Sequence, residues 1–204
     1  MRTMKIAAAA GLALTLSGCG YNRIQQLDEA AEQSKSNIGV ELTARNQLIP
    51  NLVATVKGAA GFERGTYTDV ARARAGQLAQ AEQQLNQART QTTSAVESED
   101  VNQLQTAEAA QTRAIGTYLN IAVEAYPNLR ATANFQGLQD QLTESENRIA
   151  QARRDYNESV RDYNSYIRQF PQAITAKLTG ADRKTPYQAP AGSEQAPTVN
   201  FDSM

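Results

Sequence analysis

Residues 134–170 read NFQGLQDQLTESENRIAQARRDYNESVRDYNSYIRQF, and apolar side chains recur in this stretch at a strict seven-residue interval. The first positions of the repeat are Phe135, Leu142, Ile149, Tyr156, Tyr163 and Phe170, and the second positions include Leu138, Ala152, Val160 and Ile167. This spacing predicts one long helix with a single apolar face, about 55 Å in length. Such a face cannot be buried by the helix alone, so we expect partner helices of similar length and a core role for the aromatic row.

Three further helices are predicted upstream by apolar periodicity, glycine and proline breaks, and capping residues. The first covers roughly residues 21–60, the second begins near Thr66, and the third runs from the start signal at residues 98–100 to Pro127. Asn134 is the expected cap of the fourth helix. Four helices joined by short turns favour an all-α fold, an elongated and coiled-coil-like antiparallel four-helix bundle. Two extended hairpins that associate between molecules are the alternative.

The two ends of the chain differ in composition from this helical region. Residues 1–18 have the order of a lipoprotein signal peptide, with Arg2 and Lys5 before an apolar run. Leu16, Ser17, Gly18 and Cys19 then resemble the bacterial lipobox, which predicts cleavage before Cys19 and lipid attachment to its thiol. Residues 19–180 form the expected helical bundle. Residues 181–204 are rich in proline and small polar residues, so we expect a disordered tail.

Composition excludes several classes of chemistry. The chain has no histidine and one cysteine, which rules out a Ser-His-Asp triad, a Cys-His pair, histidine-ligated zinc and an internal disulfide. No glycine-rich phosphate-binding motif is present. The 20 basic and 21 acidic residues are nearly balanced, and no basic stripe predicts a nucleic-acid partner. We therefore expect no catalytic residues, no cofactor and no metal.

Four polar residues are candidates for a buried hydrogen-bonded network. Arg45 falls on the apolar face of the first helix, Glu124 lies near the end of the third, and Asn157 and Asn164 stand beside the tyrosine row. Such a network would fix the register of the helices. The alternative, that each side chain turns to the edge of the bundle, stays open at this point. In the first helix, Pro50 also predicts a kink near residue 46.

Several sequence motifs, in this order along the chain, resemble those of the LemA family. They are residues 45–53 (RNQLIPNLV), 55–58 (TVKG), 124–129 (EAYPNL), 134–135 (NF), 146–149 (ENRI), 152–157 (ARRDYN), 163–164 (YN) and 170–171 (FP). The resemblance covers about residues 20–180. It implies an antiparallel helical bundle held at the cell envelope, with no established enzymatic activity. Family members usually carry an N-terminal membrane helix that leaves the domain facing outward, and here a lipobox at Cys19 takes its place.

The function expected from these patterns is that of a lipid-anchored, non-catalytic scaffold or adaptor for another envelope protein. The predicted partners are the membrane, reached through lipidated Cys19, and an unknown envelope protein, while self-association is left open. The expected location is the cell envelope, facing away from the cytoplasm, with the periplasmic side of an outer membrane preferred where there are two membranes. The alternatives are a membrane-surface or membrane-shaping protein and, more remotely, an enzyme.

Overall fold

A computed structural model describes the backbone of residues 2–62 and 68–188, and the side chains of residues 20–59 and 74–188. Its elements are α1 (Arg2–Phe62), α2 (Thr68–Ser98), α3 (Val101–Ala125), the short 3-10 helix η1 (Pro127–Ala131), α4 (Ala133–Tyr166) and α5 (Gln172–Thr179). The expected all-α class is therefore confirmed, and α5 is an element that the sequence patterns did not predict.

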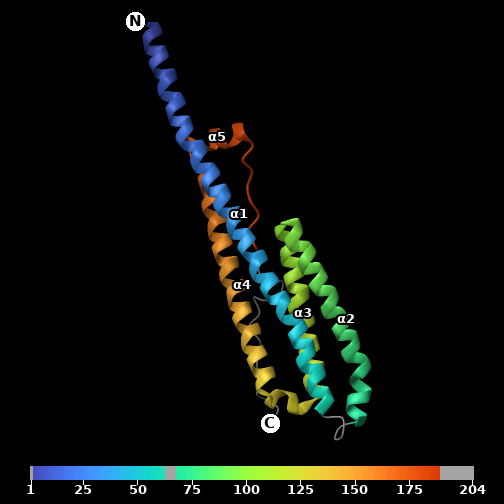
Figure 1. Cartoon of the computed structure of the whole chain (residues 1–204). Coiled ribbons are helices and arrows are strands. Elements are labelled where there is room, and N and C mark those ends of the chain that lie inside the picture. Colours follow the sequence, from blue (N-terminus) through green and yellow to red (C-terminus); the bar gives the residue numbers. More distant parts are fainter. Residues whose placement is uncertain (1, 63–67, 189–204) are drawn as a thin grey trace, which may run out of the picture.

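The long helices pack as two antiparallel pairs, α1 with α4 and α2 with α3 (Figure 1). With 61 residues α1 is about 90 Å long, whereas the 25 residues of α3 reach about 37 Å. The α2/α3 hairpin consequently covers only part of α1, and Val96 near its tip faces Gly39. Beyond that level the α1/α4 pair continues without the hairpin toward the N-terminal end.

The predicted apolar face of α4 is largely confirmed. Phe135 and Ile149 have no exposed surface, and Tyr156 and Tyr163 are nearly as well buried. Phe170 contradicts the prediction because it is 84% exposed. The reason is that α4 ends at Tyr166, so the last position of the repeat no longer follows the helical register.

The capping predictions had mixed outcomes. Asp100 is the N-cap of α3, and its carboxylate accepts from the backbone N–H groups of Asn102 and Gln103 at 2.8 and 2.9 Å. The cap of α4 is Thr132 and not Asn134. Pro50 lies within α1 and is exposed, and the helical backbone continues through it on both sides.

Among the described helices none is long and apolar enough to cross a bilayer.

The chain after α5 departs from the expected disordered tail. Gly180, with a φ of 70°, ends α5 in the left-handed region that glycine adopts without strain. Residues Ala181–Gln188, which we call the C-terminal strap, then run back along α4 (Figure 1). The predicted boundary of the tail at residue 181 is therefore too early by the length of the strap, and residues 189–204 lie outside the described part of the chain.

The core is divided along its length into apolar zones. One zone, near the η1 end, includes Ile49 and Phe135, and the next includes Leu42 and Ile149. Between Leu42 and Ile49 on α1 comes Arg45, which has no exposed surface. A layer of polar side chains thus separates two apolar zones, and it is the first part of the candidate site.

Candidate functional site

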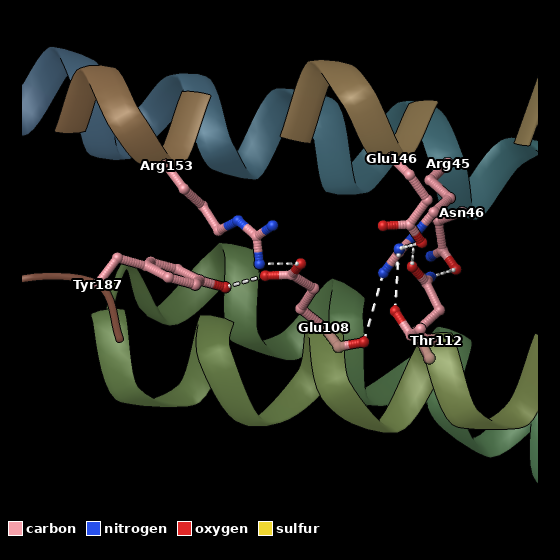
Figure 2. A network of polar contacts seen from close by, with 8 residues as sticks. Arg45, Asn46, Glu108, Thr112, Glu146, Arg153 and Tyr187 are labelled. Atoms are coloured by element: carbon pink, nitrogen blue, oxygen red, sulfur yellow. Dashed lines mark hydrogen bonds and ion pairs between the residues drawn. The ribbon is translucent and has the colours of Figure 1, made fainter. Parts of the chain in front are cut away.

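Arg45 is the centre of the polar layer. Its guanidinium donates hydrogen bonds to Gln111 Oε1 at 2.5 Å, to Thr112 Oγ1 at 3.1 Å and to the carbonyl of Glu108 at 3.4 Å, and it forms an ion pair with Glu146 (Figure 2). A charge removed from water is tolerated only when its donors find acceptors in this way. Through this single side chain α1 is joined to both α3 and α4.

Glu108 holds a second part of the layer. Its carboxylate, almost fully buried, accepts from Arg153 of α4 at 3.0 Å and from the hydroxyl of Tyr187 in the strap (Figure 2). Burial, together with the negative charge of Glu108, raises the pKa of Tyr187 far above its usual range. The hydroxyl therefore keeps its proton and acts as the donor to Glu108.

Two asparagines of α4 hold the backbone of the strap. Asn157 donates to the carbonyl of Tyr187 at 2.9 Å and accepts from its N–H at 2.7 Å. Asn164 does the same to Lys184, at 2.8 and 2.9 Å. The spacings match, since seven residues of helix and three residues of extended chain both advance about 10 Å. Each amide side chain thus satisfies one complete residue of strap backbone.

Lys184 fastens the strap to α1. Its ammonium lies 2.6 Å from Glu32 and 3.1 Å from Asp28, and 5.3 Å from the centre of the Tyr163 ring. Burial by itself lowers the pKa of Lys184, but the bonds from Glu32 and Asp28 outweigh it, and the pKa is raised. The pKa of Glu32 is lowered for the complementary reason, since Lys184 and Lys35 outweigh its desolvation.

The four predicted network residues do not form one network. Arg45 is buried as expected, whereas Asn157 and Asn164 bind the strap rather than Arg45. Glu124 follows the alternative that was left open, because its side chain is 55% exposed and pairs with Arg74 on the surface. The buried neighbours Ala122 and Ala125 occupy the inward face of α3 at that level, so the register turns Glu124 outward.

The residues of the polar layer that sequence reasoning missed are Glu108, Gln111, Glu146 and Tyr187. Gln111 had a usable signal, because it lies midway between Leu104 and Tyr118 at seven-residue spacing and so occupies the apolar face of α3. Tyr187 had no such signal. It follows proline in a polar stretch, and its burial depends on contacts with α3 and α4.

An open cleft of about 590 Å³ lies beside the polar layer, between α1 and the tip of the α2/α3 hairpin. The hairpin contributes Val96, Glu99 and Leu104 to its lining. The α1 side includes Glu29, Gln33, Ser36, Gly39, Val40, Thr43 and Gln47. Val40, on the α1 side of the lining, is 62% exposed. The cleft exists because the hairpin ends where α1 continues.

The hydrogen bonds and ion pairs of the polar layer position α1, α3, α4 and the strap relative to one another. The polar layer consists of two arginines, two carboxylates, an amide and a protonated phenol, with hydrogen bonds that hold one helix against another. In residues 20–59 and 74–188, no group of three histidine, cysteine or acidic side chains converges as a metal site would require. The four residues of the predicted lipobox, Leu16, Ser17, Gly18 and Cys19, lie outside the described side chains.

Comparison with models of known protein families shows to which family the chain belongs. A sequence model of the LemA family matches residues 34–201. The chain belongs to the LemA family. The LemA match includes α5 and the strap and so extends past residue 180, where the resemblance was expected to end. No curated protein matches this LemA chain.

Proposed function

We propose that this LemA protein is a lipid-anchored, non-catalytic adaptor of the cell envelope that holds a helix of another envelope protein in the cleft beside α1. The observation that carries the proposal is the cleft itself, an open surface on the α1 helix where the α2/α3 hairpin ends. A binding protein needs such a surface on a rigid support, and it needs no reactive group.

The side chains of the cleft suit a helical ligand. On α1 they follow one another at intervals of four and three residues, from Glu29 through Ser36 and Thr43 to Gln47, which is the spacing of a helix-packing seam. Small residues at its centre allow another helix to approach closely. Exposed Val40 supplies an apolar contact, and the glutamates and glutamines around it form a polar rim.

The polar layer supports this function by keeping the wall of the cleft in place. Arg45 connects α1 to Gln111 and Thr112 of α3, and Asn46 donates to the carbonyl of Arg89 of α2 at 3.2 Å. Both contacts lie close to the cleft residues Ala44 and Gln47. A preformed surface loses less conformational entropy on binding, so the hairpin presents Val96 and Glu99 to a ligand without rearrangement.

Anchoring and location are further parts of the proposal. The Leu16-Ser17-Gly18-Cys19 motif supports attachment of lipid to Cys19, and α1 carries the chain directly from there into the bundle. Acyl chains contribute about 0.8 kcal/mol per buried methylene, so two or more chains hold a protein on a bilayer durably. The bundle then stands on the outward side of the membrane, where an adaptor meets envelope partners.

Photocrosslinking in native membranes tests the adaptor function. A photoreactive residue at Val40 or at Gln47 should form a discrete adduct, whereas the same residue at Gln141, on the outer face of α4, should form none. Ser36→Trp fills the cleft and should abolish the adduct at Gln47. Adducts of equal yield at Gln141, or adducts that persist in Ser36→Trp, would show that the cleft is not the binding surface.

A further inference from the structure

The end of the bundle near α5 exposes an unusual amount of apolar side chain. Among the described side chains five large hydrophobic residues are exposed, and one of these is Val40 of the cleft. The other four gather near α5: Tyr21 at 44%, Phe170 at 84%, Ile174 at 54% and Leu178 at 82% exposed. Single exposed hydrophobic residues are ordinary, but a group at one end of a long bundle indicates a contact surface.

The helix α5 presents this surface because its other face packs on α1. Ala176 is buried, and a Cβ added at Gly20 of α1 would lie 3.7 Å from Thr175 Oγ1 and 3.9 Å from Gln172 Cγ. Ile174 and Leu178, one turn apart, point away from that contact. The fold does not need their side chains for burial, so α5 is an amphipathic helix with one face free.

Charge around α5 favours an anionic surface. Arg168, Lys177 and Arg183 are exposed, and none of them forms an ion pair with another described side chain. Of the acidic groups nearby, Asp182 is exposed, whereas Asp28 is already paired with Lys184. Basic residues beside exposed apolar ones are typical of helices that lie in the interface of a bilayer with acidic headgroups.

The position of α5 next to the start of the predicted mature chain identifies what its exposed face contacts. Gly20, which α5 contacts, directly follows Cys19, so α5 stands at the point where the proposed lipid leaves the chain. We propose that the outward face of α5, with Phe170 before it, lies on an anionic phospholipid surface and orients the bundle there. The orientation rests on the proposed lipid anchor at Cys19, and the lipid affinity of α5 does not.

The contact between α5 and the membrane would also fix the position of the cleft above the bilayer. Along α1 the distance from Gly20 to Val40 is about 30 Å. A bundle held by lipid alone would tilt freely about one flexible point, whereas a second contact through α5 restricts that tilt. The cleft then lies at a fixed height above the headgroups, at most about 30 Å. Only partners whose helices reach that height can bind in it.

A fluorescent label at position 178 tests the proposal in the lipidated full-length protein. Acylation blocks the thiol of Cys19, the only cysteine of the chain, so Leu178→Cys offers one reactive site for bimane. The protein is reconstituted in vesicles of phosphatidylethanolamine and phosphatidylglycerol that contain brominated lipid. We expect blue-shifted emission and at least twofold quenching at position 178, and neither at the matched control Val40→Cys.

The outcomes separate this inference from the anchor. Unquenched bimane at position 178 on vesicle-bound protein overturns the α5 contact and leaves the anchor standing. Labelling of the parent protein at Cys19 contradicts the anchor, and the α5 contact is then decided by sedimentation of the chain from Gly20 onward with the same vesicles. In that background Ile174→Ser with Leu178→Ser should weaken binding at least tenfold, and Val40→Ser should not.

A second copy of the chain is the competing occupant of the α5 face. Sedimentation velocity without vesicles distinguishes it, because our proposal expects a monomer whose mass is the same in the parent and in Leu178→Ser. A dimer that Leu178→Ser dissociates, combined with equal vesicle binding by both proteins, overturns the lipid contact. Circular dichroism of each variant confirms that the helices are intact.

Discussion

Replacing Tyr187 by alanine tests whether the strap is part of the folded core. Tyr187 is 5% exposed, and its hydroxyl donates to buried Glu108. Loss of a large buried ring costs about 3 to 5 kcal/mol. Leaving Glu108 with one partner fewer adds about 1 to 3 kcal/mol. Since small domains are stable by only about 5 to 15 kcal/mol, we expect Tyr187→Ala to remove a large part of the unfolding free energy.

Tyr187→Phe separates the two contributions. It keeps the ring and removes only the hydrogen bond to a charged acceptor, so its expected cost is about 1.5 to 3 kcal/mol. Gln188→Ala is the matched control, because Gln188 is the exposed next residue of the same strap and should change stability by less than about 0.5 kcal/mol. Urea unfolding followed by far-ultraviolet circular dichroism, on the chain from Gly20 onward, measures all three.

The pH dependence of stability gives an independent measurement on Tyr187. Its pKa is raised by burial, so between about pH 10 and the folded-state pKa the unfolded chain loses a proton that the folded chain retains. Stability is therefore unaffected below about pH 10 and falls above it, by at most about 1.4 kcal/mol per pH unit for this group. Tyr118 and Tyr156, whose pKa values are also raised by burial, contribute in the same direction. Tyr187→Phe should reduce the slope.

A small effect of Tyr187→Ala on stability would show that the strap is not part of the folded core. If Tyr187→Ala unfolds within about 0.5 kcal/mol of the parent, with the same alkaline slope, then the strap does not belong to the cooperative core. In that case the original expectation of a tail detached from residue 181 onward would hold in solution.

The remaining predictions concern the core, the polar layer and the anchor. Ile149→Ala should cost about 2 to 4 kcal/mol in urea unfolding, while Gln141→Ala should cost almost nothing, and equal midpoints would mean that the inward face of α4 is misassigned. Arg45→Met should cost about 2 to 4 kcal/mol because it leaves Gln111 without its buried donor, and a neutral result would show that water replaces the guanidinium. Cys19→Ala should leave the precursor uncut and free of lipid label in metabolic labelling, and a variant that labels like the parent would disprove the lipobox.

Several features were determined by the sequence through local physics. The seven-residue repeat around Ile149 predicted a helix and its inward face, because helical geometry alone brings residues at that spacing to one side. The start signal expected at residues 98–100 was confirmed, because Asp100 caps α3 by accepting from the N–H groups two and three residues ahead of it. The all-α class followed from the same local patterns.

Other features were decided by tertiary structure. Glu124 and Arg45 both looked like network residues, and only the packing of α3 turned one outward and enclosed the other. The short length of the α2/α3 hairpin relative to α1 produced the cleft, which no single segment encodes. Which face of α5 is exposed is likewise decided by the packing of its other face against Gly20 of α1.

The strap is the clearest case of this division. Its composition predicts disorder, because the chain near Pro186 has little apolar surface and no helical or strand periodicity. Its order comes instead from distant groups, the amides of Asn157 and Asn164 and the carboxylate of Glu108, which satisfy its backbone and its single buried hydroxyl. Local propensity acts over a few residues, whereas these partners lie 20 to 79 residues away, so only the folded bundle can bring them together.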